Sequence, residues 1–296
     1  MLKVPQTKQI YRLCRETIVG FTEDGALSHG AAIAFFTVTS MAPLLLVLTA
    51  IAGLAFGTAA AQKAIVGQLE GLTGPESANF FQSVIENASS KSSGTIASVV
   101  GVVTLFITIS GVFGEMQAAL NAIWKVKAQP TTVSRLLRAR AASFGLVVAL
   151  GFLLMTSLAV SAGLAGFGQY LQRNWPQLGV VLVVLNFLLS IVLIAIMFAA
   201  IFKVLPDRSL EWRDVILGAI ASSVLFSFGK YLIAAYLGSS GIATTYGAAG
   251  ALILLLLWVY YSVQILLLGA EFTKAYAHVF GSRKGNPSLR SKVVKV

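Results

Sequence analysis

Six long apolar stretches constrain most strongly what this chain can fold into. A helix needs ~20 apolar residues to cross ~30 Å of hydrocarbon at 1.5 Å per residue, so each stretch predicts a transmembrane helix. The fifth stretch is interrupted by one charge, Lys230. The predicted spans are Gly30 to Phe56, Gly94 to Gly114 (running on past Glu115), Ala141 to Phe167, Leu178 to Phe202, Val215 to Leu237 and Tyr246 to Ala270.

Composition supports a membrane protein. Of 296 residues, 57% are hydrophobic and 11% charged, whereas a soluble domain carries roughly a quarter charged residues. We therefore predict an all-α, polytopic membrane helix bundle with six transmembrane helices plus short interfacial helices. No polar stretch is long enough for a separate core, so we divide the chain into a cytoplasmic leader (1–28), one membrane domain (29–272) and a basic cytoplasmic tail (273–296).

The distribution of Lys and Arg predicts the orientation. Eighteen of the 22 fall in the leader, two alternate loops and the tail, three fall on the other side, and Lys230 lies within a span. Cytoplasmic loops carry the excess of positive charge, so we expect both termini to be cytoplasmic. The net charge of +11 then follows from orientation, and we expect no nucleic-acid partner. Contact of the basic loops and tail with anionic lipid headgroups is one interpretation, and a solvated charge run is the simpler one.

Two polar segments are expected at the membrane surface. Residues 58–93 mix acidic and apolar residues at helical spacing, which predicts two short outer helices broken at Gly74 and Pro75. Residues 131–140 predict an interfacial helix on the inner side, with Arg135 and Arg138 turned to water.

The chain lacks the residue clusters that common membrane enzymes need. It has one cysteine, Cys14, two histidines, His29 and His278, and no HExxH, CxxC or GxxxxGK[ST] motif. We therefore predict no metal site, no cofactor, no ATPase and no enzymatic activity. Both histidines are expected at cytoplasmic helix ends, as interfacial residues. Near Pro206, Asp207, Glu211 and Asp214 are expected to form a solvated turn.

Several predicted spans carry polar residues on one helical face, and these are the candidate substrate-pathway residues. Packing explains small residues equally well, and pairing with basic loop residues explains the acidic ones near the inner boundary. Lys230 can also extend outward to the interface. The candidates are Thr37, Ser40, Pro43, Thr108, Glu115, Ser227, Lys230, Tyr261, Gln264 and Glu271.

Pro43 is the distinctive residue of the first span. Proline lacks the amide that would bond to the carbonyl of Thr39, so a kink beside Thr37 and Ser40 would leave a polar notch. In transporters such notches line cavities, although a bend needed only for packing explains it equally well. We expect a polar cavity among the first, second, fifth and sixth helices.

Four segments resemble one known family. They are "LSHGAAIAFFTVTSMAPLLLVL" from Leu27, "GVFGEMQAALNAIW" from Gly111, "FKVLPD" from Phe202 and "TYGAAGALILLLLWVYYSVQILLLGAEFTKAY" from Thr245. On these motifs the chain resembles the YihY/virulence factor BrkB family of bacterial inner-membrane proteins, once labelled ribonuclease BN. The resemblance implies a six-helix, multi-pass inner-membrane protein with a role in transport and supplies no catalytic residues. We expect no nuclease activity, because phosphodiester cleavage needs clustered metal ligands.

Three functional interpretations remain open. The first is an ATP-independent transporter or flippase for a lipid-like or amphiphilic substrate. The alternatives are an ion- or proton-coupled transporter of a small solute and a non-transporting scaffold in envelope assembly. The sequence leaves open the substrate, the direction, the energy source and the oligomeric state.

Overall fold

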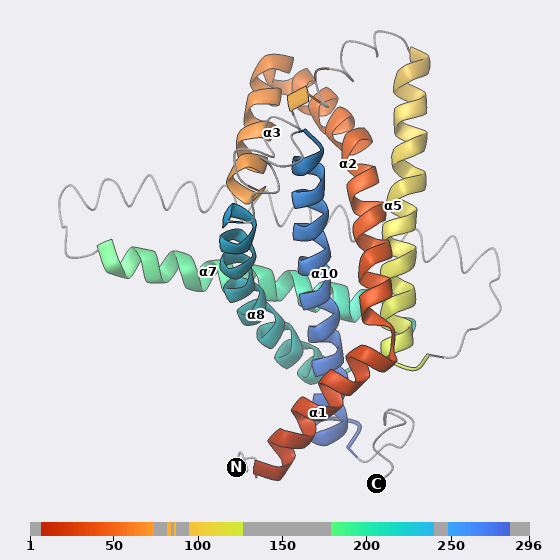
Figure 1. The fold of residues 1–296 in the computed structure, drawn as a ribbon, viewed down its shortest axis with the longest axis vertical. Helices are drawn as coiled ribbons and strands as arrows, with labels where there is room; N and C mark the ends of the chain where they lie inside the picture. Colours follow the sequence, from red (N-terminus) through yellow and green to blue (C-terminus); the bar gives the residue numbers. More distant parts are fainter. Residues whose placement is uncertain are drawn as a thin grey trace. The chain divides into compact units, whose positions relative to one another are not determined.

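The computed structural model describes residues 7–73, 82–83, 86, 95–126, 179–239 and 248–284. Within these residues the fold is entirely helical (Figure 1). The helices are α1 (Thr7–Glu23), α2 (Ala26–Phe56), α3 (Thr58–Thr73), α5 (Thr95–Ile123), α7 (Gly179–Val204), α8 (Trp212–Ser239) and α10 (Ala248–Val279).

Four described helices are long and apolar enough to cross a membrane. The candidate spans are Val103–Ile123, Phe187–Val204, Trp212–Ile233 and Leu252–Val279, and Ala26–Met41 forms a shorter apolar helix. They fall on the second, fourth, fifth and sixth stretches expected from the sequence. The first expected span corresponds to α2, which continues as a helix through Pro43. The third, residues 141–167, and the inner interfacial helix, residues 131–140, lie outside the described residues.

Two helices continue past a glutamate, and one of them, α10, extends past the end expected from hydropathy. The sixth stretch was expected to end at Ala270, before Glu271, but α10 continues to Val279. The second was expected to run on past Glu115, and α5 continues to Ile123. Polar partners compensate both carboxylates: Glu115 pairs with His29 and Glu271 with Lys274. The first residues of the expected tail, 273–279, are therefore helical.

The expected leader contains a helix that packs on its neighbours. One face of α1 is buried through Leu13, Glu16, Thr17 and Gly20. The helix ends before Gly25, whose φ of 68° is a left-handed conformation that glycine adopts without steric cost. Beyond α2, α3 spans Thr58–Thr73, and the break expected at Gly74 and Pro75 lies outside the described residues. Most of the second expected outer helix lies outside the described residues.

The chain forms two compact units. Unit 1 comprises residues 1–26, 117–228 and 265–296, and unit 2 comprises residues 27–116 and 229–264. Helices α5, α8 and α10 contribute residues to both. The core of unit 1 includes Trp124, Phe202 and Leu267, each no more than 1% exposed, and the core of unit 2 includes Ile33 and Leu255, equally buried.

In unit 1, α8 and α10 pack through reciprocal contacts between glycines and hydroxyl groups. A Cβ on Gly218 would overlap the hydroxyl of Thr273, and a Cβ on Gly269 would overlap that of Ser222. Each hydroxyl is satisfied within its own helix: Ser222 donates to the Gly218 carbonyl and Thr273 to the Gly269 carbonyl, both at 2.7 Å. Small residues thus let the two backbones approach closely.

Candidate functional site

Unit 1 contains a buried cluster of charged residues, here called the ion cluster: Asp24, Lys125, Glu271 and Lys274. The Lys274 ammonium lies 2.9 Å from a carboxylate oxygen of Asp24 and 2.5 Å from one of Glu271. Lys125 pairs with the other oxygen of Asp24. The Glu271 and Lys274 side chains are at most 4% exposed, so these two groups interact largely out of water.

Local structure positions each of these groups. Asp24 lies in the turn between α1 and α2, where its amide donates to the Gly20 carbonyl at 2.8 Å. Lys125 follows the last turn of α5 with a φ of 52°, an uncommon value for a residue with a side chain. The Val126 amide donates to the Asn121 carbonyl at 2.9 Å, which closes the helix end in a Schellman-type turn. Lys125 is thereby held beside Asp24.

The charge state of Asp24 follows from these partners. Burial alone would raise the pKa of its carboxyl, but the charge of Lys274 and hydrogen bonds with Glu271, Lys125 and Lys274 lower the pKa below its usual value. Asp24 is therefore ionised at neutral pH. The turn after α1 carries a fixed negative charge that binds Lys274 of α10.

A second set of pairs joins α1 to α10. Glu16 accepts from the Arg12 guanidinium at 2.8 Å and contacts Nδ1 of His278 at 2.7 Å. Glu16 and His278 are buried, whereas the Arg12 side chain is 48% exposed. Figure 1 shows α1 lying across the C-terminal end of α10. The chemistry of these pairs is structural: they tie the N-terminal helix to the end of the last described helix.

The acidic residues near Pro206 do not all form the solvated turn that we expected. Asp214 is only 3% exposed and accepts a hydrogen bond from the Ser282 hydroxyl at 2.6 Å. Asp207 accepts from Asn121 at 2.8 Å and from Gln117 at 3.0 Å. Asp207 and Glu211 are exposed, as expected, and Asp214 is the residue that differs. The difference arises because α5 and the segment after α10 bring polar partners to this loop.

No group of three or more His, Cys, Asp or Glu side chains in the described parts of the chain is placed to hold a metal ion. Asp207 and Asp214 each bind amide or hydroxyl donors. These two carboxylates therefore hydrogen-bond within the protein.

Unit 2 contains a different arrangement, here called the polar layer: His29, Gly30, Glu115 and Gln264. Nδ1 of His29 lies 2.6 Å from a carboxylate oxygen of Glu115, and both side chains are about one quarter exposed. One residue along α2, a Cβ on Gly30 would overlap the side-chain amide of Gln264. The polar layer therefore draws on α2, α5 and α10, which are labelled in Figure 1.

Gln264 is the unusual member of the polar layer. Its amide nitrogen and its amide oxygen are both buried and have no hydrogen-bond partner among the described residues. Burying an amide without partners costs roughly 1–3 kcal/mol on the evidence of protein mutations, and buried polar groups are otherwise nearly always bonded. Gln264 therefore places one donor group and one acceptor group, both without partners among the described residues, inside the protein.

Only some of the ten residues predicted from the sequence come together. Ser227 and Glu271 lie in unit 1 and the other eight in unit 2. Of those eight, Glu115 and Gln264 belong to the polar layer. Neither the pocket of about 400 Å³ around Lys63 and Val66 nor the one of about 320 Å³ beside His278 is lined by any of the ten, so the expected cavity stays a prediction.

The hydroxyl groups around Pro43 bond to their own helix. The Thr37 hydroxyl donates to the Ile33 carbonyl at 2.7 Å, and the Ser40 hydroxyl donates to the Thr37 carbonyl at 2.8 Å. Pro43 itself is buried. Such bonds satisfy hydroxyl groups inside a helix without a partner from another helix.

The remaining predicted residues occupy varied surroundings. Thr108 bonds back to the Thr104 carbonyl at 3.0 Å. The Lys230 ammonium lies 5.1 Å from the centre of the Tyr231 ring, a cation–π distance. Ser227 is buried and its hydroxyl has no hydrogen-bond partner among the described residues. Tyr261 is half-buried.

The sequence interpretation missed the ion cluster, although a signal was present. Glu271, Lys274 and His278 recur at intervals of three and four residues, which places them on one face of a helix. A charged face at the end of an apolar span needs charged partners, and Asp24 and Glu16 in the leader were available. The spacing of Gly218 with Ser222 and of Gly269 with Thr273 likewise signals close helix packing.

Comparison with known proteins supports this description of a membrane protein. The chain is 28% identical over 264 residues to a UPF0761 membrane protein of Rhodospirillum centenum, covering 88% of this chain and 56% of that protein. It is 29% identical over 198 residues to one of Alteromonas mediterranea, covering 65% and 64%. The chain thus spans less than two thirds of the length of these relatives. No solved structure matches it.

The family assignment rests on nearly the whole chain. Residues 17–292 match the family described as Virulence factor BrkB, a range that includes α2, α5, α8 and α10 with both polar arrangements. The relatives are named as membrane proteins, in agreement with the four candidate spans. The protein is a multi-pass integral membrane protein that belongs to the virulence factor BrkB family.

Proposed function

We propose that the protein is an ATP-independent transporter or flippase that moves a lipid-like or amphiphilic substrate across the bacterial inner membrane and has no enzymatic activity. The observation that carries this proposal is Gln264, whose buried amide has no hydrogen-bond partner among the described residues. A primary amide offers two donors and one acceptor. A polar group of a passing substrate would form hydrogen bonds with the Gln264 amide, and these bonds would offset the cost of removing the substrate group from water.

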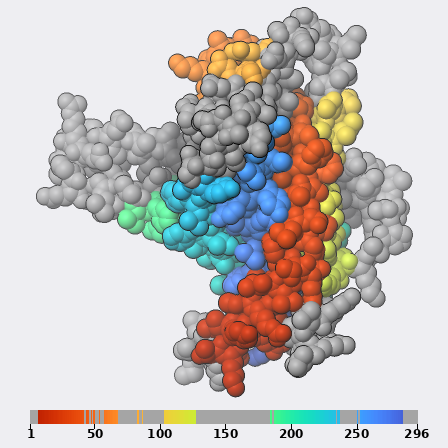
Figure 2. Space-filling view, viewed as in Figure 1, coloured from red at the N-terminus to blue at the C-terminus, as the bar shows by residue number. Residues whose placement is uncertain are grey.

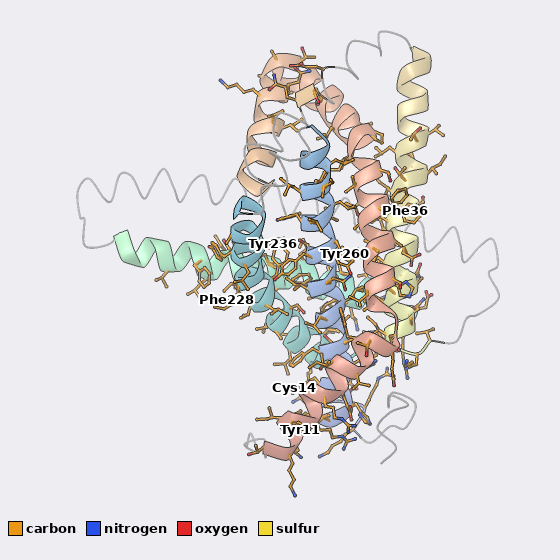
Figure 3. All side chains as sticks on the ribbon, viewed as in Figure 1. Tyr11, Cys14, Phe36, Phe228, Tyr236 and Tyr260 are labelled. Atoms are coloured by element: carbon orange, nitrogen blue, oxygen red, sulfur yellow. The ribbon has the colours of Figure 1, made fainter. Side chains whose placement is uncertain are left out.

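The surroundings of Gln264 suit a substrate with one polar and one apolar part. His29 and Glu115 supply a polar pair next to Gly30. One turn further along α2, Ile33 is fully buried, and beyond it Phe36 lies against Gly111 of α5; Figure 3 labels Phe36. A polar layer bordered by apolar side chains matches an amphiphile, whose headgroup and chain need different neighbours.

A second candidate function is proton-coupled transport of a small solute. The supporting observation is the His29 and Glu115 pair at 2.6 Å, because an imidazole beside a carboxylate can take up and release a proton. In this alternative, transport depends on a proton gradient and the substrate is soluble. An envelope scaffold remains the third alternative and predicts no transport at all.

Reconstitution of the purified full-length protein distinguishes these functions. In sealed vesicles of phosphatidylethanolamine and phosphatidylglycerol, fluorescent short-chain analogues of both lipids would be followed by quenching of the outer leaflet. The proposal predicts movement between leaflets without ATP and without a pH gradient, faster than in protein-free vesicles. Movement that requires a pH gradient would favour proton coupling. Rates equal to those of protein-free vesicles for every probe would contradict transport of these lipids and favour the scaffold.

A further inference from the structure

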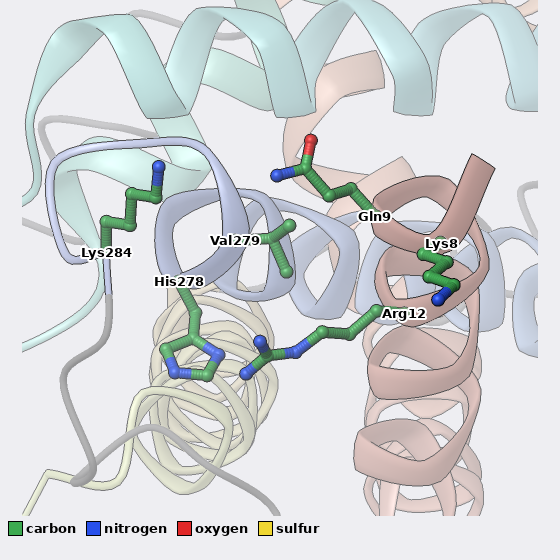
Figure 4. Close-up of a pocket in the computed structure, with 6 residues that line it drawn as sticks. All are labelled: Lys8, Gln9, Arg12, His278, Val279 and Lys284. Atoms are coloured by element: carbon green, nitrogen blue, oxygen red, sulfur yellow. The ribbon is translucent and has the colours of Figure 1, made fainter. Parts of the chain in front are cut away.

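Unit 1 carries a pocket of about 320 Å³ that the proposed transport function does not use. It lies between the start of α1 and the end of α10, as Figure 4 shows. We call it the basic pocket. It is lined by Lys8, Gln9, Arg12, His278, Val279 and Lys284.

The basic pocket is rich in positive charge. Three of its six lining residues are Lys or Arg, and none is acidic. The carboxylate of Glu16 bridges two of the lining residues, Arg12 at 2.8 Å and His278 at 2.7 Å. Lys8 and Lys284 form no ion pair with any described residue. One carboxylate against three cations leaves a surplus of positive charge, so the pocket attracts anions.

The backbone around the pocket also favours an anion. Lys8 and Gln9 belong to the first turn of α1, which contains no acidic residue, and the first amides of a helix are unpaired and carry a partial positive charge. At the end of α10, two of the last four carbonyls, which would repel an anion, already accept backbone hydrogen bonds. The Tyr276 carbonyl accepts from the backbone amides of Phe280 and Gly281 at 2.8 and 2.9 Å. The Ala277 carbonyl accepts from the backbone amide of Arg283 at 3.0 Å.

The size and chemistry of the pocket fit a phosphate group. Its volume lies at the small end of the range for ligand pockets, roughly 300–1,000 Å³. Arg12 offers a planar donor fork, Lys8 and Lys284 offer mobile ammonium groups, and Gln9 offers an amide donor. In Figure 4 the side chains of Lys284 and Gln9 extend on either side of Val279, and Arg12 lies next to His278.

We propose that the basic pocket is a binding site for a phosphate-bearing anion, held by Lys8, Arg12 and Lys284. Two sources share this chemistry, a phospholipid headgroup and a soluble phosphate. Much of α1 lies at the surface in the space-filling view (Figure 2). Tyr11 and Ile18, with 71% and 62% exposed side chains, lie beside the basic residues of that helix. Such a helix rests readily on a lipid surface, so a lipid arm belongs in the test.

The test measures binding to the purified full-length protein in neutral detergent by calorimetry. The probes are inorganic phosphate and dioctanoyl phosphatidic acid, with uncharged dioctanoylglycerol as the control ligand. Lys8→Gln combined with Lys284→Gln removes two exposed cations of the pocket. The matched control is Arg15→Gln combined with Arg213→Gln, which removes two exposed cations outside it and gives the same net charge.

The proposal predicts that at least one phosphate probe binds, that the Lys8 and Lys284 variant binds it at least tenfold more weakly, and that the control variant stays within twofold. Binding of phosphatidic acid alone identifies a lipid headgroup, and equal binding of inorganic phosphate identifies a soluble anion. Equal losses in the two variants, or phosphate probes that bind no better than dioctanoylglycerol, would overturn the proposal.

A second measurement does not depend on variants. The wild-type protein is acetylated with an amine reagent with and without saturating probe, and lysine labelling is read by mass spectrometry. Bound probe should slow labelling of Lys8 and Lys284 at least threefold and leave the exposed Lys63 unchanged. If bound probe leaves the labelling rates of Lys8 and Lys284 unchanged, or slows labelling of Lys63 by the same factor, binding in the basic pocket is contradicted.

Discussion

At the scale of single residues, Asp24 determines how the N-terminal helix is attached in unit 1. Its carboxylate is 2% exposed and holds both Lys125 and Lys274. Replacing a buried ion pair by apolar groups is often neutral, but removing one partner leaves an uncompensated buried charge and costs roughly 3–5 kcal/mol. Lys274 is the residue that would be left with fewer partners.

We predict that Asp24→Asn lowers the free energy of unfolding in detergent by about 3 kcal/mol at pH 7. Folding lowers the pKa of Asp24, so its stabilising contribution is present above the pKa of an unfolded Asp, about 3.9, and is lost as pH falls through the lower folded pKa. Between pH 3 and 7, the difference in unfolding temperature between wild type and variant should therefore become smaller as the pH falls.

The control is Arg12→Gln, whose partly exposed ion pair should contribute less than about 1 kcal/mol. If the loss of unfolding temperature caused by Asp24→Asn is constant with pH, or no larger than the loss caused by Arg12→Gln, the carboxylate charge does not stabilise the fold.

The residue scale is also where sequence reasoning was weakest. Glu115 and Glu271 were recognised as charged residues at the inner boundary, but their partners His29 and Lys274 were not identified. Such pairs depend on which helices lie next to each other and at what height, and hydropathy does not contain that information. Gln264 was selected from its helical face, whereas the lack of partners for its amide is visible only in the structure.

At the scale of helices, the length of the apolar stretches predicted where the helices lie better than where they end. Four expected spans coincide with α2, α7, α8 and the greater part of α10, because an apolar run of that length in lipid must bond its backbone as a helix. The end of α10 was predicted nine residues too early at Ala270, because Glu271, which follows, finds a partner in Lys274.

The contact between α8 and α10 gives a prediction at this scale. Gly269→Ala should lower the free energy of unfolding by about 1–3 kcal/mol, because the added methyl group overlaps Ser222 in a close-packed interface. Adding Ser222→Gly should restore much of the loss by making room. Gly114→Ala serves as the control, since a Cβ there meets open space, and it should be neutral or slightly stabilising. Equal effects of Gly269→Ala and Gly114→Ala in chemical denaturation would contradict the close approach.

At the scale of the whole molecule, the contacts within unit 1 bring the start and the end of the described chain together. Glu16 of α1 meets His278 of α10, and Asp24 meets Lys274. These contacts agree with the excess of Lys and Arg in the leader and tail, and we propose that both termini are cytoplasmic.

Cys14 offers a direct check of this orientation, because it is the only cysteine and is exposed on α1; Figure 3 labels it beside Tyr11. A membrane-impermeant maleimide should label Cys14 in inverted inner-membrane vesicles and leave it unlabelled in intact spheroplasts. Labelling in spheroplasts at the same rate as in inverted vesicles would reverse the proposed topology.

Transport through the polar layer is the central claim for the whole molecule, and Gln264 distinguishes it from simple packing. If the amide served only the fold, Gln264→Leu would lower stability. Because the amide has no hydrogen-bond partner among the described residues, its replacement by an apolar group of similar size should leave the unfolding temperature unchanged or raise it. The matched control is Ser262→Ala on the same helix, whose hydroxyl bonds to the Trp258 carbonyl at 2.9 Å.

The most direct test is the rate at which fluorescent phosphatidylglycerol moves between leaflets in ATP-free vesicles containing equal amounts of wild type, Gln264→Leu or Ser262→Ala. We predict that Gln264→Leu reduces the protein-dependent rate at least tenfold while its unfolding temperature does not fall, and that Ser262→Ala keeps at least half of the wild-type rate. A Gln264→Leu protein that is fully folded and moves the lipid as fast as wild type would contradict the proposed role of the polar layer.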